Sequence, residues 1–267
     1  MTVIGVVGDA ATTSAVALAV GWPARDDVVV LEADPGGGSL AGWLDTPAHP
    51  SLATMVAGVG TGAGHRTVWE ALDTMTHQGR SGVRFVANAV RARAAHRAVE
   101  EAAQAVLPAM AAAPITVIAD AGAHRPGEAP SPALRVADVV VLVHRQATAS
   151  AAAATVRIER LVETVEELAH LDTEIVLAVI GATPFEPAEI GAFITQSVPA
   201  TVHTTTSISH DPLAAATIAG RTGVSAKRLR RLPLMRDASR VAMTLSDIVD
   251  TQRHAHVDER FAGEQTT

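Results

Sequence analysis

Short runs of β-branched and other apolar residues alternate along the chain with alanine-rich stretches of helical length. The runs are apolar on both faces, which is typical of parallel strands covered by helices on both sides. They are Val3–Val7, Val28–Glu32, Val83–Asn88, Ile115–Asp120, Val139–His144, Ile175–Ile180 and Val202–Thr206. The stretches between them are Thr12–Val20, Ser51–Val56, Thr67–Met75, Ala92–Ala112, Ala147–Leu171, Pro187–Thr195 and Pro212–Ala219. This alternation predicts an α/β fold: a doubly wound, mostly parallel sheet of about seven strands with helices on both faces.

The composition fits one domain with a large core. Of the 267 residues, 48% are hydrophobic and 18% are charged, and no linker or repeat divides the chain. We expect a single domain over residues 1–257 and a flexible C-terminal tail over residues 258–267. Cysteine is absent from the sequence, which excludes disulfides, thiolate metal sites and cysteine nucleophiles.

Charge, aromatic content and the N-terminal sequence narrow the classes of function. The net charge is −7 and aromatic residues make up 3%, so we expect no specific nucleic-acid binding. The 11 histidines form no metal-binding spacing. The N-terminus is typical of a buried strand and not of a signal peptide, and no uncharged apolar stretch is long enough to span a membrane. We therefore expect a cytoplasmic protein.

The turn after the first predicted strand lies where a phosphate-binding loop would lie in such a fold, because free N–H groups at the start of a helix attract anions. A working loop also needs a lysine, but the one lysine of the chain is Lys227 and no basic residue precedes Arg25. A strand-to-helix turn in which Asp9 caps the helix is the alternative. The residues of a vestigial nucleotide site here would be Gly8, Asp9, Ala10, Ala11, Thr12, Thr13 and Asp34.

Acidic residues end two further predicted strands. Glu32 and Asp34 lie two residues apart, so in an extended chain their side chains project to the same side. Asp120 ends another strand. Because ligands bind beyond the carboxyl ends of parallel strands, these carboxylates are candidate partners of magnesium or of a ribose hydroxyl. A polar strand end followed by a glycine-rich turn is the alternative for Glu32 and Asp34.

A basic stretch, Lys227–Arg236, carries five basic residues in ten positions. Such a run suits an anionic membrane surface, nucleic acid or an acidic partner, and a solvated helix end is the alternative. The apolar residues that follow recur every three to four positions, which predicts an amphipathic helix packed on the sheet. They are Leu234, Ala238, Val241, Leu245 and Ile248.

Taken in order, these segments resemble the MinD/ParA family of deviant P-loop ATPases. The resemblance covers about residues 1–250 and rests on Thr12-Thr13, VVVLEADPGGGSLAGWL, ITVIADAG, ADVVVLVHRQATASAAAA and VIGATPFEPAEI. Asp34 matches the second acid of the family's D-x-D-P strand end. The arginine-rich, lysine-poor composition looks actinobacterial. The resemblance implies a homodimer, ATP and magnesium as candidate cofactors, and as candidate magnesium ligands Thr12, Glu32, Asp34 and Asp120.

The loop departs from the family's Lys-Gly-Gly-x-Gly-Lys-Thr-Thr pattern. Ala11 stands where the second lysine is expected, and the first lysine has no counterpart. The asparagine that helps to read adenine is replaced near Gly181-Ala182. Each lost lysine removes charge-assisted contacts worth about 1.5–3 kcal/mol, together with charge stabilisation on which phosphoryl transfer depends. We therefore expect a degenerate Walker A loop, weak or no ATPase activity and no catalytic residue.

The expected function is that of a pseudo-ATPase: a positioning or scaffold protein that acts through dimerisation and partner binding. Degenerate loops occur in the CpaE/TadZ branch of the family, which positions pilus and secretion machinery at the membrane. The partner is expected in such machinery or in cell-division or partition machinery, with the protein cytoplasmic or peripheral at the membrane. One alternative is an ATPase that takes a cation from a partner subunit. The other is a Rossmann-type dinucleotide-binding enzyme with Glu32 on a ribose.

Overall fold

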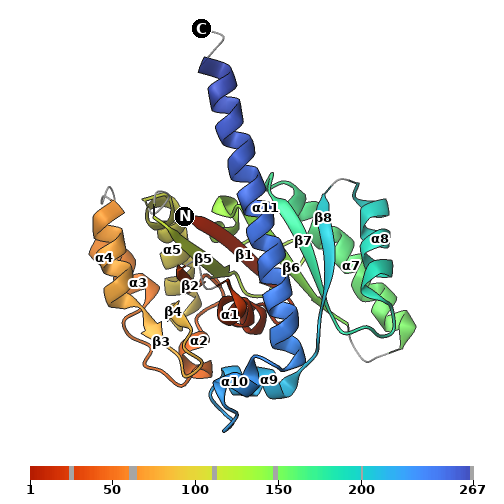
Figure 1. Ribbon diagram of the computed structural model, residues 1–267, viewed down its shortest axis with the longest axis horizontal. Helices are drawn as coiled ribbons and strands as arrows, with labels where there is room; N and C mark the ends of the chain where they lie inside the picture. Colours follow the sequence, from red (N-terminus) through yellow and green to blue (C-terminus); the bar gives the residue numbers. More distant parts are fainter. Residues whose placement is uncertain (24–26, 60–64, 110–112, 147–149, 200, 265–267) are drawn as a thin grey trace.

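An eight-stranded sheet runs through the computed structural model, which describes residues 1–23, 27–59, 65–109, 113–146, 150–199 and 201–264 (Figure 1). The strand order is β3-β4-β2-β5-β1-β6-β7-β8, and all neighbours are parallel except β3 and β4. The strands are β1 (Thr2–Gly8), β2 (Asp27–Glu32), β3 (His77–Gln78), β4 (Arg84–Val86), β5 (Ile115–Asp120), β6 (Val139–Arg145), β7 (Glu174–Ile180) and β8 (Val202–Ile208).

The predicted doubly wound α/β fold is confirmed, and each of the seven predicted strands is present. The eighth strand, β3, has two residues and lies antiparallel at an edge, so it is too short to carry a hydrophobic pattern. Strand β1 lies between β5 and β6 and is not next to β2. In a Rossmann-type sheet the first two strands are neighbours, so this topology argues against the dinucleotide-binding alternative.

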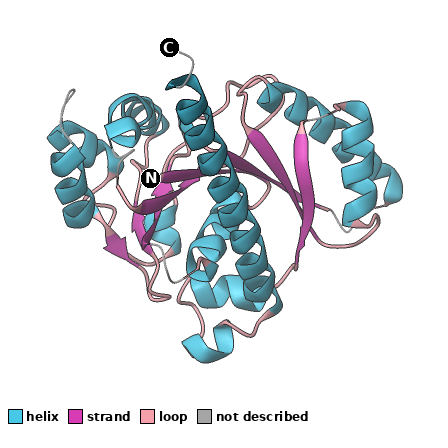
Figure 2. Cartoon of the chain, turned by 45° about the horizontal axis from the view of Figure 1, so that its top comes forward, coloured by secondary structure: helices cyan, strands magenta, loops and turns pink. Residues whose placement is uncertain are grey.

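Two helical layers cover the sheet (Figure 2). One contains α1 (Ala11–Gly21), α9 (Pro212–Ile218) and α11 (Pro233–Glu264). The other contains α3 (Leu52–Val59), α4 (His65–Met75), α5 (Ala92–Glu101), α7 (Ala151–Ala169) and α8 (Pro187–Ser197). In β1, Ile4 and Val6 face the first layer, whereas Val7 faces the second. Successive residues of a central strand are thus buried on opposite sides, which explains why these strands are apolar throughout.

Shorter elements complete the connections. They are α2 (Leu40–Trp43), the π-helix η1 (Ala102–Val106), α6 (Leu107–Ala109), the 3-10 helix η2 (Pro132–Val136) and α10 (Ala226–Leu229). The helix predicted over Ala92–Ala112 is found as α5, η1 and α6 in succession, and residues 110–112 lie outside the described residues. The helix predicted over Ala147–Leu171 is found as α7, with residues 147–149 outside the described residues.

The predicted C-terminal amphipathic helix is confirmed as α11, which packs on α1 and projects beyond the sheet (Figure 1). The side chains predicted to face the core are buried: Leu234, Ala238, Val241, Leu245 and Ile248. Residues 258–264 of the expected tail belong to this helix, and residues 265–267 lie outside the described residues. The domain boundary at residue 257 stays a prediction. Within the described ranges, no helix combines the length and the apolar character needed to cross a membrane.

Candidate functional site

The carboxyl ends of the central strands bring the predicted site residues to one edge of the sheet. Glu32 at the end of β2 is in register with Asp120 at the end of β5, and Val6 of β1 pairs with Asp120 from the other side. Gly8, which ends β1, pairs with Val143 of β6. The first loop and the strand-end acids are therefore neighbours, as expected from parallel strands.

The first loop is tied to the strands beside it through its own N–H groups. Gly8 N donates to Gly122 O at 2.9 Å, and Asp9 N donates to Val143 O at 2.8 Å. Gly8 has φ of 109°, and a side-chain Cβ there would lie 2.4 Å from Val143 O, so only glycine fits this crossing. The N–H groups of Gly8, the last residue of β1, and of Asp9 are thus engaged inside the protein.

The prediction that Asp9 caps α1 is wrong. The helix starts at Ala11 and its N-cap is Ala10, which has φ of 59° and no side chain that could cap. Asp9 lies one residue too early for the N-cap position. Its carboxylate turns instead toward α7 and β6, where Oδ2 accepts from Arg157 Nη2 at 2.6 Å and from Arg145 N at 3.2 Å.

A buried histidine completes the surroundings of Asp9. The Nδ1 atom of His144 lies 3.8 Å from Asp9 Oδ2, and the His144 side chain is 6% exposed. Burial lowers the pKa of His144, and the nearby Arg157 acts in the same direction, while Asp9 acts in the opposite one. Because the pKa of His144 lies below its ordinary value, the imidazole is neutral at neutral pH. The basic partner of Asp9 in this group is therefore Arg157.

Glu32 is an internal hydrogen-bond acceptor. It is 1% exposed, and its Oε1 accepts from Ser39 N and Leu40 N, both at 2.6 Å, while Oε2 accepts from Asn88 N at 2.7 Å. Burial raises the pKa of Glu32, and these three hydrogen bonds oppose that effect. The carboxylate thus fixes the start of α2 against the segment after β4, and both of its oxygens are engaged by the backbone.

Asp34 connects the loops that follow β2 and β5. Its Oδ1 accepts from Gly36 N at 2.7 Å, and burial raises its pKa. Gly122 has φ of 72°, and a Cβ at this position would lie 2.3 Å from the Asp34 carboxyl group. A glycine is therefore required at residue 122 both by its conformation and by the close approach of Asp34.

Asp120 is the most perturbed acid of the site. It is fully buried, its Oδ1 accepts from Gly122 N at 3.2 Å, and its Oδ2 has no hydrogen-bond partner among the described residues. Burial raises the pKa of Asp120 to about 7, against hydrogen bonds from Thr12 and Gly122 that lower it. Thr12 therefore contacts Asp120, and both were predicted as residues of the same site. Ala11 is 3% exposed, so its methyl group is buried.

These residues do not fit a magnesium-bound triphosphate. The loop offers no cation, two of its N–H groups are engaged, and both oxygens of Glu32 are taken by the backbone. In the part of the chain that the structure describes, no group of three or more histidine or acidic side chains is arranged to hold a metal ion.

The loop after β5, residues 122–132, is held in place from two sides. His124 Nε2 and Gly127 N contact Oε2 and Oε1 of Glu167 on α7 at 2.7 Å and 2.6 Å. Ser131 Oγ donates to Ala33 O at 2.8 Å. Glu167 and Arg157 could not be predicted as site residues from the sequence, because a half-buried polar residue of a helix carries no signal of its distant partner. The result is a loop with a defined conformation.

Two cavities flank the first loop. One, of about 600 Å³, lies between the ends of β1 and β6, residues 124–126 and α7. The other, of about 330 Å³, is lined by Thr13 and Ser14 of α1, by Trp43 and Arg145, and by residues 209–212. Thr13, a predicted site residue, thus faces a different cavity from Gly8 and Asp9.

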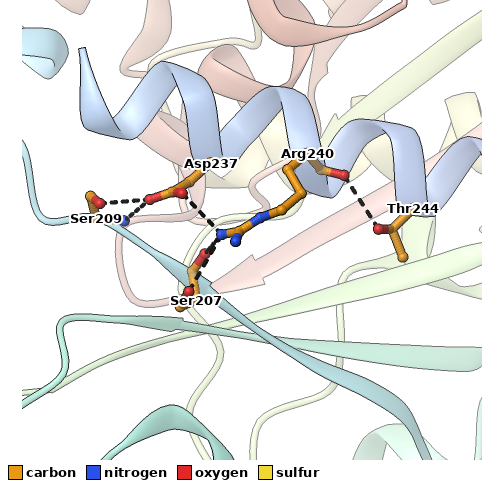
Figure 3. A network of polar contacts seen from close by, with 5 residues as sticks. All are labelled: Ser207, Ser209, Asp237, Arg240 and Thr244. Carbon is orange, nitrogen blue, oxygen red and sulfur yellow. Dashed lines mark hydrogen bonds and ion pairs between the residues drawn. The ribbon is translucent and has the colours of Figure 1, made fainter. Parts of the chain in front are cut away.

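A polar network fixes the wall of the smaller cavity (Figure 3). Asp237 of α11 accepts from Ser209 N and Ser209 Oγ at 2.9 Å and 2.6 Å, and Arg240 Nη2 donates to Asp237 Oδ1 at 2.9 Å. Arg240 also donates to Ser207 O at 3.1 Å. The end of β8 is thereby tied to the start of α11.

The basic stretch lies on and beside α10. The side chains of Lys227, Arg228, Arg230 and Arg231 are exposed, and Leu229 is buried at 4% and anchors the turn. Among the described residues none of these four basic groups has an acidic partner within ion-pair distance. They form an uncompensated positive patch on an otherwise acidic protein.

The sequence matches no family model and no curated protein sequence. Its structure is similar to a ParA family ATPase from Chlorobium tepidum TLS (14% identity, TM-score 0.64, 91% of this chain and 97% of that chain). It is similar to the cell division ATPase MinD of Pyrococcus furiosus (14% identity, TM-score 0.63, 92% of this chain and 99% of that chain). It is also similar to a chain of the MinC:MinD cell division protein complex of Aquifex aeolicus (12% identity, TM-score 0.63, 92% of this chain and 96% of that chain). The chain therefore has the fold of the MinD/ParA P-loop ATPases.

Proposed function

We propose that the protein is a MinD/ParA-like positioning or scaffold protein that acts through dimerisation and partner binding, with weak or no ATPase activity. The observation that carries this proposal is the state of the first loop. No lysine is present there, the Gly8 and Asp9 N–H groups are bonded to the protein, and Asp9 is paired with Arg157. Phosphoryl transfer depends on positive groups placed around the phosphates, and this loop supplies none.

The fixed loop after β5 is the first docking surface of the proposal. Hydrogen bonds that involve Glu167, His124 and Ser131 hold this loop within the protein. A surface that is ordered in advance loses less conformational entropy when a partner binds. The loop therefore suits a constitutive, nucleotide-independent contact.

The basic stretch, residues 227–236, is the second docking surface. Its exposed basic groups suit an acidic partner protein or an anionic membrane surface, and such contact weakens as salt increases. The likeness to MinD in a MinC:MinD complex supports a protein partner as well as a dimer. We place the protein in the cytoplasm, peripheral to a membrane at pilus, secretion, division or partition machinery.

A second candidate is an ATPase that takes its missing cation from a partner subunit. One observation favours it: Asp120 Oδ2 is buried and has no partner among the described residues, next to Thr12 and Asp34. Magnesium-dependent turnover that disappears in Asp34→Ala would establish this candidate against the scaffold proposal. We expect the isolated protein to hydrolyse ATP no faster than a blank.

Sedimentation velocity tests the dimer. We expect a dimer at micromolar concentration, with the same distribution with and without ATP and magnesium. A monomer under both conditions would remove dimerisation from the proposal, and a dimer that forms only with ATP would favour the second candidate.

A triple variant tests the basic stretch. Arg228→Ala, Arg230→Ala and Arg231→Ala together should weaken cosedimentation with phosphatidylglycerol vesicles and the pull-down of cellular partners. The matched control removes three exposed arginines of the α5 region, as Arg91→Ala, Arg93→Ala and Arg97→Ala. Equal binding by both triple variants would show that only net charge matters and would contradict a specific docking role.

A further inference from the structure

The larger cavity beside the first loop has features that the scaffold role does not use. Its floor is the end of β1 and β6, its roof is the segment of residues 124–126, and its wall is one face of α7. We propose that this cavity binds a small phosphorylated organic molecule. Its volume of about 600 Å³ lies in the range of small-molecule sites, which is roughly 300–1,000 Å³.

The polar part of the lining suits a phosphoryl group. Arg157 and Arg160 come from successive turns of α7, and Arg125 comes from the roof. Guanidinium groups bind phosphoryl oxygens in a bidentate manner. The acids of the lining are Asp9 and Glu163. Three arginines and two carboxylates thus line the cavity itself.

The arginines differ in how far they are already engaged. Arg157 is paired with Asp9 at 2.6 Å, and Arg125 lies 3.8 Å from Glu128 with both side chains largely exposed. Arg160 is exposed and has no ion-pair partner among the described residues. Arg160 is therefore free to bind a ligand directly. Asp9 holds Arg157 as an incoming phosphoryl group would, so the ligand competes with Asp9.

Besides His124, His144 and Thr164, the remaining side chains of the lining are apolar and suit an organic body on the ligand. Leu161 of α7, Leu142 and Val143 of β6, and Pro126 of the roof face the same cavity. Apolar surface of this kind gains little from a bare inorganic ion but binds a hydrocarbon or ring. The predicted ligand thus has a phosphoryl group at the arginines and a less polar part against these residues.

Isothermal titration calorimetry with phenyl phosphate as the probe tests the proposal in the full-length protein. We expect saturable binding that is tighter than that of inorganic phosphate or phenol. Arg160→Gln should weaken it about tenfold or more, because one charge-assisted pair is lost. The matched control Arg93→Gln removes an exposed arginine of α5 and should leave binding unchanged. Asp9→Asn should tighten binding several-fold, because it frees Arg157 from its internal carboxylate.

Other arms separate this site from the vestigial nucleotide site. Asp34→Ala should leave phenyl phosphate binding intact. ADP is tested in the absence of magnesium. If the wild type binds ADP and Arg160→Gln does not, the organic phosphate is a nucleotide that binds in this cavity. Absence of saturable binding, equal affinity in Arg160→Gln, loss of binding in Asp34→Ala, or preference for a polyglutamate peptide would each overturn the proposal. Magnesium-dependent ATP turnover lost in Asp34→Ala contradicts the scaffold function alone and leaves this inference standing.

Discussion

The carboxylate of Asp9 and the guanidinium of Arg157 lie 2.6 Å apart, although 148 residues separate them along the chain. This pair joins the first loop to α7. The negative charge of Asp9 is thus balanced by a basic residue of the protein itself.

The first prediction concerns the coupling between these two residues. The Asp9 and Arg157 side chains are 42% and 38% exposed, so solvent screens the pair and its worth is about 0.5–1 kcal/mol. Urea unfolding of Asp9→Ala, Arg157→Gln and the double variant should give a coupling energy of that size. The pair Arg97–Glu101 on α5, with Arg97 82% exposed, is the control and should show less. A coupling energy of zero would mean that Asp9 acts without Arg157.

The second prediction concerns pH. Burial raises the pKa of Asp120 to about 7, so the folded protein binds a proton that the unfolded chain releases at its ordinary pKa of 3.8. The stability from this group is present below that value and is lost as pH rises toward 7. Unfolding free energies measured at about pH 5 and about pH 8 should therefore differ less in Asp120→Asn than in the wild type. Asp73→Asn, at an exposed site, should keep the wild-type difference; an unchanged difference in Asp120→Asn would contradict the assignment.

The third prediction concerns the loop after β5. Burial acts to raise the pKa of Glu167, but the hydrogen bonds from Gly127 and His124 outweigh it and hold this pKa below its usual value. Glu167 is therefore charged at neutral pH and keeps its hydrogen bonds to the loop. These hydrogen bonds weaken only in acid, as the pH falls through the lowered pKa of Glu167.

Limited proteolysis with a glutamate-specific protease measures how far Glu167 protects the loop from cleavage, because exposed Glu128 lies within the loop. Glu167→Gln should speed cleavage after Glu128 about tenfold, since a charged acceptor of two hydrogen bonds is lost. Glu166→Gln, at the exposed neighbouring position of α7, is the control. Equal cleavage in the two variants would show that Glu167 does not order the loop.

The sequence predicted the sheet well and the site only in part, for physical reasons. Strands such as Ile115–Asp120 are buried on both faces, so their composition alone marks them. Parallel pairing then brings Glu32 and Asp120 into register at one edge. The partners of these residues could not be predicted in the same way. Asp9 contacts Arg157, and Glu32 contacts Asn88, only because tertiary packing brings them together. Such pairs leave no local pattern in the sequence.

We propose that the first loop binds no nucleotide, and thermal unfolding followed by calorimetry with ATP and magnesium is the sharpest test of this. Tight binding at a ligand concentration of about 100 times Kd would stabilise the native state by about 2.7 kcal/mol. We predict that ATP with magnesium leaves the unfolding temperature of the wild type unchanged, and that Asp34→Ala behaves the same. A magnesium-dependent increase in the wild type that is abolished in Asp34→Ala would contradict the claim.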